Sequence, residues 1–311
     1  MPILPNTTIE MPHELALMLK DYSYVKNTNG YSLAIVSLYK KDGEEFYLKA
    51  ERSESEIKRE YSIMKWLSGR LPVPEVKYFD ERNGWFFMLT TALKSSENPK
   101  EWYLPESYEK YEKDIGLLAE GLFMLQGVDI TDCPFVINNE IIFQNAIKNI
   151  DTNYVNMFIH GNKDKYDEDS GDLLGQFRFG NHLDRPFDSP TEFYDWLLKN
   201  KPQPQEELCF THGDYSNFID DGNKIIGFID VGGAGINNKW TDIAFCVRSI
   251  GYRSKNIDLK AKYVDLLFKK LSLTPDWNKI NYHIWLGRMV RRNWANGIIN
   301  QKDIDRSFGI I

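Results

Sequence analysis

The chain has 311 residues, of which 42% are hydrophobic, 27% charged and 14% aromatic. This composition is typical of a globular protein with one large domain or about two lobes, and it excludes an intrinsically disordered chain. The net charge is −7, so the protein is not expected to bind nucleic acid, which favours basic surfaces. The acidic surface is either simply solvated or attracts a cationic ligand.

The N-terminus and the cysteines indicate the compartment in which the protein works. Residues 1–20 contain acids and prolines and no basic flank before an apolar core, so they do not form a signal peptide. No apolar run approaches the ~20 residues that a membrane-spanning helix needs. The three cysteines are far apart and form no C-x-x-C pair, which predicts neither a disulfide nor a zinc framework. We therefore expect a cytoplasmic protein without a membrane partner.

The N-terminal third of the chain predicts a small sheet and one helix. Strand-like stretches occur at 32–39, 46–50, 76–79 and 85–90. Turn sequences at 41–43 and 82–84 join them in pairs. Between the pairs, apolar residues recur at helical spacing over 56–67, and the prolines of the following Leu71-Pro72-Val73-Pro74 end that helix.

After about Leu93 the sequence changes character. The polar, proline-containing residues 94–105 indicate a lobe boundary, and the charged residues 162–170 indicate an exposed loop. Helices are predicted over 108–126, 190–199, 258–271 and 276–294, and a short strand over 208–211. We therefore expect an N-terminal lobe at 1–93 and a C-terminal lobe at 94–311.

The strongest chemical signal is His212-Gly213-Asp214, which follows the short strand directly. The turn at 220–223 predicts a hairpin whose open end collects Asp214, Asn217 and Asp230. Phosphoryl transfer needs a carboxylate that takes the proton of the acceptor hydroxyl, and oxygen ligands that hold magnesium against the phosphates. Asp214 fits the first role, and Asn217 and Asp230 fit the second. Taken alone, Asp214 could equally be a turn or cap residue. The glycine-rich residues 231–235 predict a flexible backbone that a ligand can approach.

A lysine that handles the phosphates is expected among the N-terminal strands. Side chains alternate along a strand, so Tyr47 and Lys49 share one face. Glu60 lies between Ile57 and Met64 on the apolar side of its helix, where a carboxylate needs a cationic partner. Lys49 and Glu60 therefore form the natural pair, as in kinases. The alternative is that Lys49 is exposed and Glu60 lies at the edge of the apolar face. Tyr47 could equally stack on a nucleobase or be a partly buried strand residue.

In these residues the chain resembles the aminoglycoside phosphotransferases, especially the group that acts on the 3′-hydroxyl. The resemblance covers almost the whole chain to about residue 285. Its motifs are Phe46-Tyr47-Leu48-Lys49, Leu71-Pro72-Val73-Pro74, Asp129-Ile130-Thr131-Asp132-Cys133-Pro134, His212-Gly213-Asp214, Phe228-Ile229-Asp230-Val231-Gly232 and Lys239-Trp240-Thr241-Asp242-Ile243-Ala244-Phe245-Cys246-Val247-Arg248-Ser249-Ile250. The resemblance implies a protein-kinase-like α+β fold of two lobes, with a small antiparallel sheet and one helix in the N-lobe and a larger, mainly helical C-lobe.

The resemblance also implies a function and residue roles. The function is Mg²⁺-dependent transfer of the terminal phosphate of ATP or GTP to an aminoglycoside hydroxyl, which gives antibiotic resistance. Asp214 would be the catalytic base, Asn217 and Asp230 the magnesium ligands, and Asp242 a support for the catalytic loop. The implied nucleotide-binding residues are Ser32 over the phosphates, Lys49 and Glu60 as the phosphate pair, Tyr47 on the base, and the backbone of Thr91 and Leu93 at the base edge.

Two departures from the family pattern leave alternatives open. The family reads H-G-D-x-x-x-x-N, whereas only Tyr215 and Ser216 separate Asp214 from Asn217 here, which favours a catalytically impaired, nucleotide-binding protein. At positions where the family carries acids, this chain holds Gly251, Tyr252, Arg253, Gly287 and Arg288, and Arg291 and Arg292 follow. These residues favour a kinase for another small hydroxylated metabolite. The alternative is that these arginines form a solvated helix face, and acids at 164–172 could serve a cationic substrate. The acceptor, the choice of ATP or GTP and the oligomeric state stay open.

Overall fold

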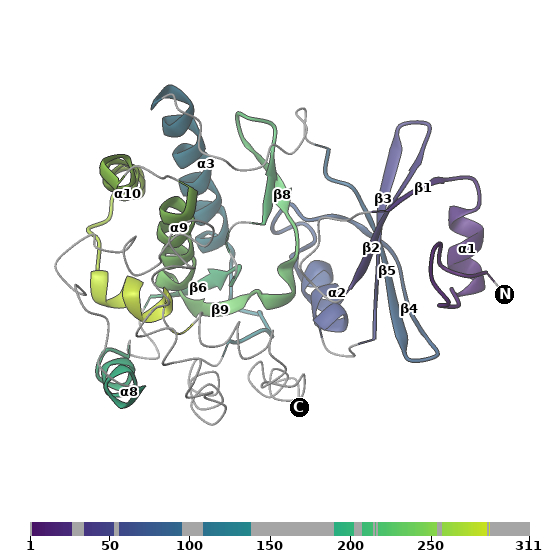
Figure 1. Cartoon of the computed structure of the whole chain (residues 1–311), viewed down its shortest axis with the longest axis horizontal. Coiled ribbons are helices and arrows are strands. Elements are labelled where there is room, and N and C mark those ends of the chain that lie inside the picture. Colours follow the sequence, from purple (N-terminus) through teal and green to yellow (C-terminus); the bar gives the residue numbers. More distant parts are fainter. Residues whose placement is uncertain are drawn as a thin grey trace, which may run out of the picture. The chain divides into compact units, whose positions relative to one another are not determined.

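The computed structural model describes residues 2–26, 34–52, 56–94, 108–137, 190–201, 207–213, 215, 217–253, 257–284 and 286 (Figure 1). The chain divides into two compact units. The first comprises Met1–Ser95 and Ile226–Gly233, and the second comprises Ser96–Ile225 and Ala234–Ile311. The segment Ile226–Gly233, which contains Asp230, therefore belongs to the same unit as Lys49 and Glu60.

A five-stranded antiparallel sheet forms the centre of the first unit, in the order β1-β2-β3-β5-β4. Its strands are β1 (Ser23–Lys26), β2 (Ile35–Lys41), β3 (Glu44–Glu51), β4 (Val76–Arg82) and β5 (Trp85–Thr91). Two-residue turns connect β2 to β3 and β4 to β5. Their residues have positive φ angles, namely 49° and 84° at Asp42 and Gly43, and 51° and 72° at Asn83 and Gly84. This conformation matches the twist of the strands, and these residue types tolerate it.

The two faces of this sheet pack against different helices, and Figure 1 shows α1 and α2 on opposite sides of it. The N-terminal helix α1 (His13–Leu19) and one face of the sheet share a core that includes Leu15, Leu48 and Phe87. Because side chains alternate along a strand, Lys49 points to the other face. The helix α2 (Glu56–Leu67) covers that face, and its apolar residues are buried.

The second unit is mainly helical. Its described helices are α3 (Tyr108–Gln126), α8 (Pro190–Lys199), α9 (Trp240–Arg253), α10 (Ile257–Leu271) and the helical residues 277–284. The long helix α3 contacts both α9 and α10. Two short strands, β6 (Leu208–Thr211) and β9 (Gly235–Asn238), pair in antiparallel fashion. The strand β7 (Phe218–Asp220) forms the hairpin on the turn at 220–223 with β8 (Ile225–Phe228), along which the chain passes into the first unit.

The predicted α+β class is confirmed, and several elements have the predicted bounds. These are the helices at 56–67, 108–126 and 190–199 and the strand at 208–211. Of the helix predicted over 276–294, residues 277–284 and 286 are described and helical. The loop predicted at 162–170 and nearly all of 94–105 lie outside the described residues. No described helix is both long enough and apolar enough to cross a membrane.

The backbone over 231–235, predicted to be flexible, is largely part of two short regular elements, and the approach of a ligand to it stays a prediction. Val231–Gly233 form a short 3-10 helix, η1, and Gly235 begins β9. A methyl group added at Gly235 would lie 2.6 Å from the carbonyl oxygen of Phe135. The N–H of Ile236 donates to that same carbonyl at 2.7 Å. The close approach that requires glycine at 235 is therefore made by the chain itself.

Candidate active site

An ion pair between β3 and α2 lies on the α2-covered face of the sheet. The Lys49 ammonium nitrogen Nζ is 2.7 Å from Glu60 Oε2, and the two side chains are 15% and 5% exposed. Glu60 reaches the sheet because it lies on the face of α2 that buries Ile57 and Met64. Since both charges are shielded from water, each depends on the other for its stability in the folded state.

Asp230 is the second carboxylate near Lys49. Its Oδ1 lies 3.6 Å from Lys49 Nζ, and its side chain is 60% exposed. Asp230 adopts a φ of 53°, which is uncommon outside glycine and directs the chain from β8 into η1. The buried Arg59 on α2 donates from Nε to the carbonyl oxygen of Gly232 at 2.9 Å. One helix thus holds Glu60 against Lys49 and also fixes the segment that follows Asp230. Sequence reasoning missed Arg59.

The remaining predicted nucleotide-binding residues of the first unit lie on β3 and at the end of β5. Tyr47 is 37% exposed and shares the α2-covered face of the sheet with Lys49. The Thr91 N–H donates to the Glu75 carbonyl at 2.9 Å. Leu93 follows β5 and packs closely on Gly227, where an added methyl group would lie 2.8 Å from Leu93 Cδ1. Because the Thr91 amide is engaged, a contact of Thr91 with a base edge would not use that N–H.

Three predicted residues belong to segments that the structure describes only in part. Asp214 and Ser32 lie outside the described residues. Asn217 is described and half-buried, immediately before β7. The structure therefore brings together Lys49, Glu60 and Asp230, while the positions of Asp214 and Ser32 remain predictions.

Asp242 holds the loop immediately before Asp214. This buried carboxylate in the first turn of α9 accepts the His212 N–H at Oδ2, at 2.6 Å, and the Gly213 N–H at Oδ1, at 2.9 Å. Hydrogen bonds from backbone amides to a carboxylate are stronger than those between neutral groups. These two contacts are what the predicted supporting role of Asp242 requires.

Tyr215 anchors the shortened loop after Asp214. Its side chain is fully buried, and its hydroxyl donates to the Leu118 carbonyl on α3 at 2.7 Å. Burial raises the pKa of Tyr215 well above its usual value, so the hydroxyl keeps its proton. A methyl group added at Gly121 would lie 2.0 Å from this hydroxyl, so the glycine on α3 makes room for the tyrosine.

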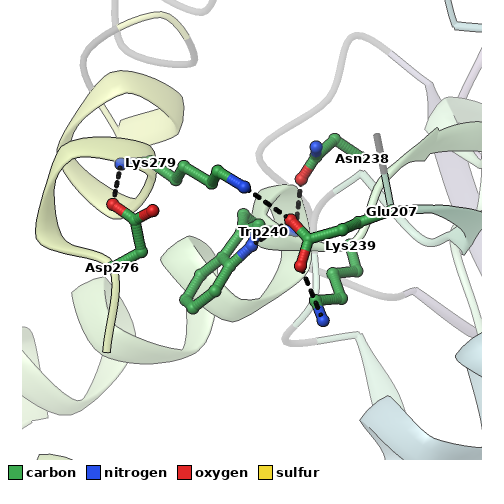
Figure 2. A network of polar contacts seen from close by, with 6 residues as sticks. All are labelled: Glu207, Asn238, Lys239, Trp240, Asp276 and Lys279. Carbon is green, nitrogen blue, oxygen red and sulfur yellow. Dashed lines mark hydrogen bonds and ion pairs between the residues drawn. The ribbon is translucent and has the colours of Figure 1, made fainter. Parts of the chain in front are cut away.

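A polar cluster around Glu207 joins three segments of the second unit (Figure 2). One Glu207 oxygen accepts the Trp240 indole N–H and an N–H of the Lys279 ammonium, both at 2.7 Å, and the other lies 2.9 Å from Lys239 Nζ. Burial acts to raise the pKa of Glu207, but hydrogen bonds from Lys279, Lys239 and Trp240 outweigh it and lower the pKa to about 2. No local sequence pattern marks Glu207, since Trp240 and Lys279 are 33 and 72 residues further along the chain.

A second polar contact joins α9 to the helical residues 277–284, one helical turn from Lys279. His283 Nδ1 lies 3.2 Å from Thr241 Oγ1, and both residues are buried. Burial, with a smaller contribution from the charge of Lys279, lowers the pKa of His283 to about 3. The ring is therefore neutral in the folded protein at neutral pH.

Acid is expected to destabilise the protein through His283. The unfolded chain binds a proton at His283 near pH 6.5, whereas the folded chain does so only near pH 3. The contribution of the neutral His283 ring to folding stability is complete above pH 6.5. It is lost as the pH falls below that value, by about 1.4 kcal/mol per pH unit, and the loss reaches about 2 kcal/mol at pH 5. Urea unfolding of the wild type and His283→Asn between pH 7.5 and 5 measures the difference. The variant, which cannot take up this proton, should lose less stability; parallel pH profiles would contradict the prediction.

The family model described as "Phosphotransferase enzyme family" matches residues 25–279. Among named proteins, the chain is similar to aminoglycoside 3'-phosphotransferases from two bacteria. The protein of Enterococcus faecalis is 35% identical over 284 residues, which cover 89% of this chain and 97% of the relative. The protein of Staphylococcus aureus is 35% identical over 285 residues, with the same shares of the two chains covered.

Solved structures show the same fold. An aminoglycoside-3'-phosphotransferase of type VIII superposes with a TM-score of 0.61 at 19% identity, covering 89% of this chain and 98% of that one. An aminoglycoside phosphotransferase from Streptomyces rimosus, in complex with ADP and streptomycin, superposes with a TM-score of 0.59 at 15% identity, covering 89% and 97%. The kinase-like fold implied by the sequence is therefore confirmed.

Proposed function

The chain belongs to the phosphotransferase enzyme family, and on that premise we propose that it is an aminoglycoside phosphotransferase of the 3′-hydroxyl type. It transfers the terminal phosphate of ATP or GTP to a hydroxyl of an aminoglycoside antibiotic. The observation that carries the proposal is the Lys49–Glu60 ion pair with Asp230 beside it. The relatives of Enterococcus faecalis and Staphylococcus aureus, which span nearly the same length, support the choice of acceptor.

The residues 1–93 are proposed as the nucleotide-binding lobe. Lys49, aimed by Glu60, neutralises the phosphates, and Tyr47 offers its exposed ring to the base. Ser32 lies in the segment proposed to cover the phosphates, and the backbone of Thr91 and Leu93 is proposed to meet the base edge. The Streptomyces rimosus relative in complex with ADP supports a nucleotide donor.

Asp230 and Asn217 are proposed as the two residues that would hold a Mg²⁺ ion. The exposed Asp230 carboxylate fits such an ion, because magnesium prefers a few carboxylate or amide oxygens and completes its shell with phosphates and water. When bound, the ion neutralises the charge that develops on the transferred phosphate.

The residues 94–311 are proposed as the catalytic and substrate-binding lobe. Asp214 acts as the base that orients the acceptor hydroxyl and takes its proton as the oxygen attacks the phosphate. Asp242 fixes the two amides directly before it, and Tyr215 fixes the loop directly after it. The shortened loop is therefore anchored on both sides of Asp214, which favours an active enzyme over an impaired one.

A turnover assay tests this function. The purified protein is incubated with ATP or GTP, with and without Mg²⁺, and with an aminoglycoside that carries a 3′-hydroxyl or its 3′-deoxy counterpart. We expect nucleoside diphosphate and phosphorylated drug only when Mg²⁺ and the 3′-hydroxyl are both present. Turnover confined to other hydroxylated metabolites would replace the proposed acceptor. Nucleotide binding without any turnover would contradict the proposed activity.

A further inference from the structure

We propose that the helical residues 277–284 position the loop that carries Asp214, through contacts with the first turn of α9. Lys279, His283 and Glu207 are the positioning residues. The proposal rests on the function proposed above, because that function makes Asp214 the base. The contacts of these residues given below all lie within the second unit, so their proposed effect on phosphate transfer passes through the backbone of the loop.

The first contact joins Lys279 to the start of α9 through Glu207. Lys279 and the Trp240 indole N–H share one oxygen of this carboxylate, at 2.7 Å each (Figure 2). The Glu207 carbonyl in turn accepts the Lys239 N–H at 3.0 Å, immediately before α9 begins. The side chain and the backbone of Glu207 therefore both hold the N-terminus of α9. Glu207 also directly precedes β6, the strand that leads to His212.

The second contact lies on the same face of the helical residues 277–284, which we call the C-terminal helix because they form the last helix among the described residues. Lys279 and His283 are four residues apart, so they lie on one face, one turn from each other. His283 Nδ1 lies 3.2 Å from Oγ1 of Thr241, the residue after Trp240, and both residues are buried. Two consecutive residues of α9 are thus tied to two consecutive turns of the other helix.

The next residue of α9 holds the catalytic loop. Asp242 accepts the N–H groups of His212 and Gly213, the two residues before Asp214. Because the first turn of a helix moves as a unit, a displacement at Trp240 or Thr241 also displaces Asp242. Consecutive positions of one helical turn therefore link the C-terminal helix to the catalytic loop.

Apolar contacts keep the C-terminal helix attached independently of these polar ones. Ile280, Tyr282 and Ile284 are buried. The Phe268 ring on α10 packs between Trp240 and Trp277, with both centroid distances at 6.3 Å. The polar contacts therefore set how the helix aligns with α9, and removing one of them should leave the helix in place.

The experiment compares Lys279→Met, which removes the ammonium group, with Lys279→Arg, which retains a donor to Glu207. Lys262→Met on the exposed side of α10 is the matched control. The first readout is hydrogen exchange at the His212 and Gly213 amides, with β3 amides as the internal reference. The second is kcat and the nucleotide KM, measured well below the melting temperature of every variant.

Lys279→Met is expected to speed exchange at these two amides about tenfold, the factor that one weakened hydrogen bond to a charged group implies. The β3 amides should be unchanged. kcat should fall by a similar factor at constant nucleotide KM, and Lys279→Arg should restore most of both. Unchanged exchange at His212 and Gly213, or equal acceleration throughout the chain, would overturn the proposal.

Thr241→Val tests the second contact without altering a charge. It removes the hydroxyl that meets His283 and keeps the side-chain shape, so the same pattern of local exchange and kcat is expected. A loss confined to thermal stability would count against the positioning role. If the wild type transfers no phosphate, the proposed function fails, and the exchange rates alone still decide whether the helix holds the loop.

Discussion

Replacing Asp214 by alanine is expected to abolish phosphate transfer while nucleotide binding survives. Asp214 is the proposed base, and loss of a general base lowers a rate by roughly 10²–10⁴-fold. The nucleotide is proposed to be held by Lys49, Glu60 and Tyr47 and not by Asp214, so its dissociation constant should stay within about twofold. Steady-state turnover and nucleotide titration measure the two quantities.

Two further variants make the Asp214 result specific. Asp214→Asn keeps the shape of the side chain and removes only its basicity, so it should be nearly as inactive. Asp265→Ala changes an exposed carboxylate on α10 and should retain full activity. Substantial turnover by Asp214→Ala would show that another group takes the proton of the acceptor.

Replacing Lys49 by methionine is expected to lower kcat/KM for the nucleotide by about 10- to 150-fold, the range for a hydrogen bond to a charged group. Lys49 is 2.7 Å from Glu60 and only 15% exposed, so water cannot replace it at the phosphates. The variant should also unfold more readily, because the buried Glu60 carboxyl group loses this partner. Initial rates with ATP and with GTP, and a melting curve, are the measurements.

The pair of Lys40 and Glu45 provides a matched control for Lys49 and Glu60. Its nitrogen–oxygen distance is also 2.7 Å, but its side chains are 47% and 31% exposed. Lys40→Met should cost no more than about 1 kcal/mol, because water screens an exposed pair. A double-mutant cycle of Lys49→Met with Glu60→Gln isolates the coupling of the buried pair. If Lys49→Met left the kinetics for both nucleotides unchanged, the proposed phosphate role would be wrong.

Local sequence patterns determined those elements that are amphipathic by themselves. The helices at 56–67 and 108–126 carry apolar residues at helical spacing, and their bounds agree with the structure. The turns at Asp42-Gly43 and Asn83-Gly84 were predictable, because only a few residue types accept positive φ angles. The pairing of Lys49 with Glu60 followed from a carboxylate on the apolar side of a helix, which needs a cation nearby.

Tertiary structure alone decided the elements and contacts that depend on distant partners. The strand β9 contains three polar or glycine residues and has no strand pattern, yet it pairs with β6 and also bridges to Val136, next to which Gly235 allows the Phe135 carbonyl to approach. Glu207 meets Trp240 and Lys279, which are far along the chain, and Arg59 meets the carbonyl of Gly232. Such contacts form only when the folded backbone brings the two groups together. The sequence by itself therefore determined the family and predicted the reacting groups, and the fold decided which side chains hold the segments next to them.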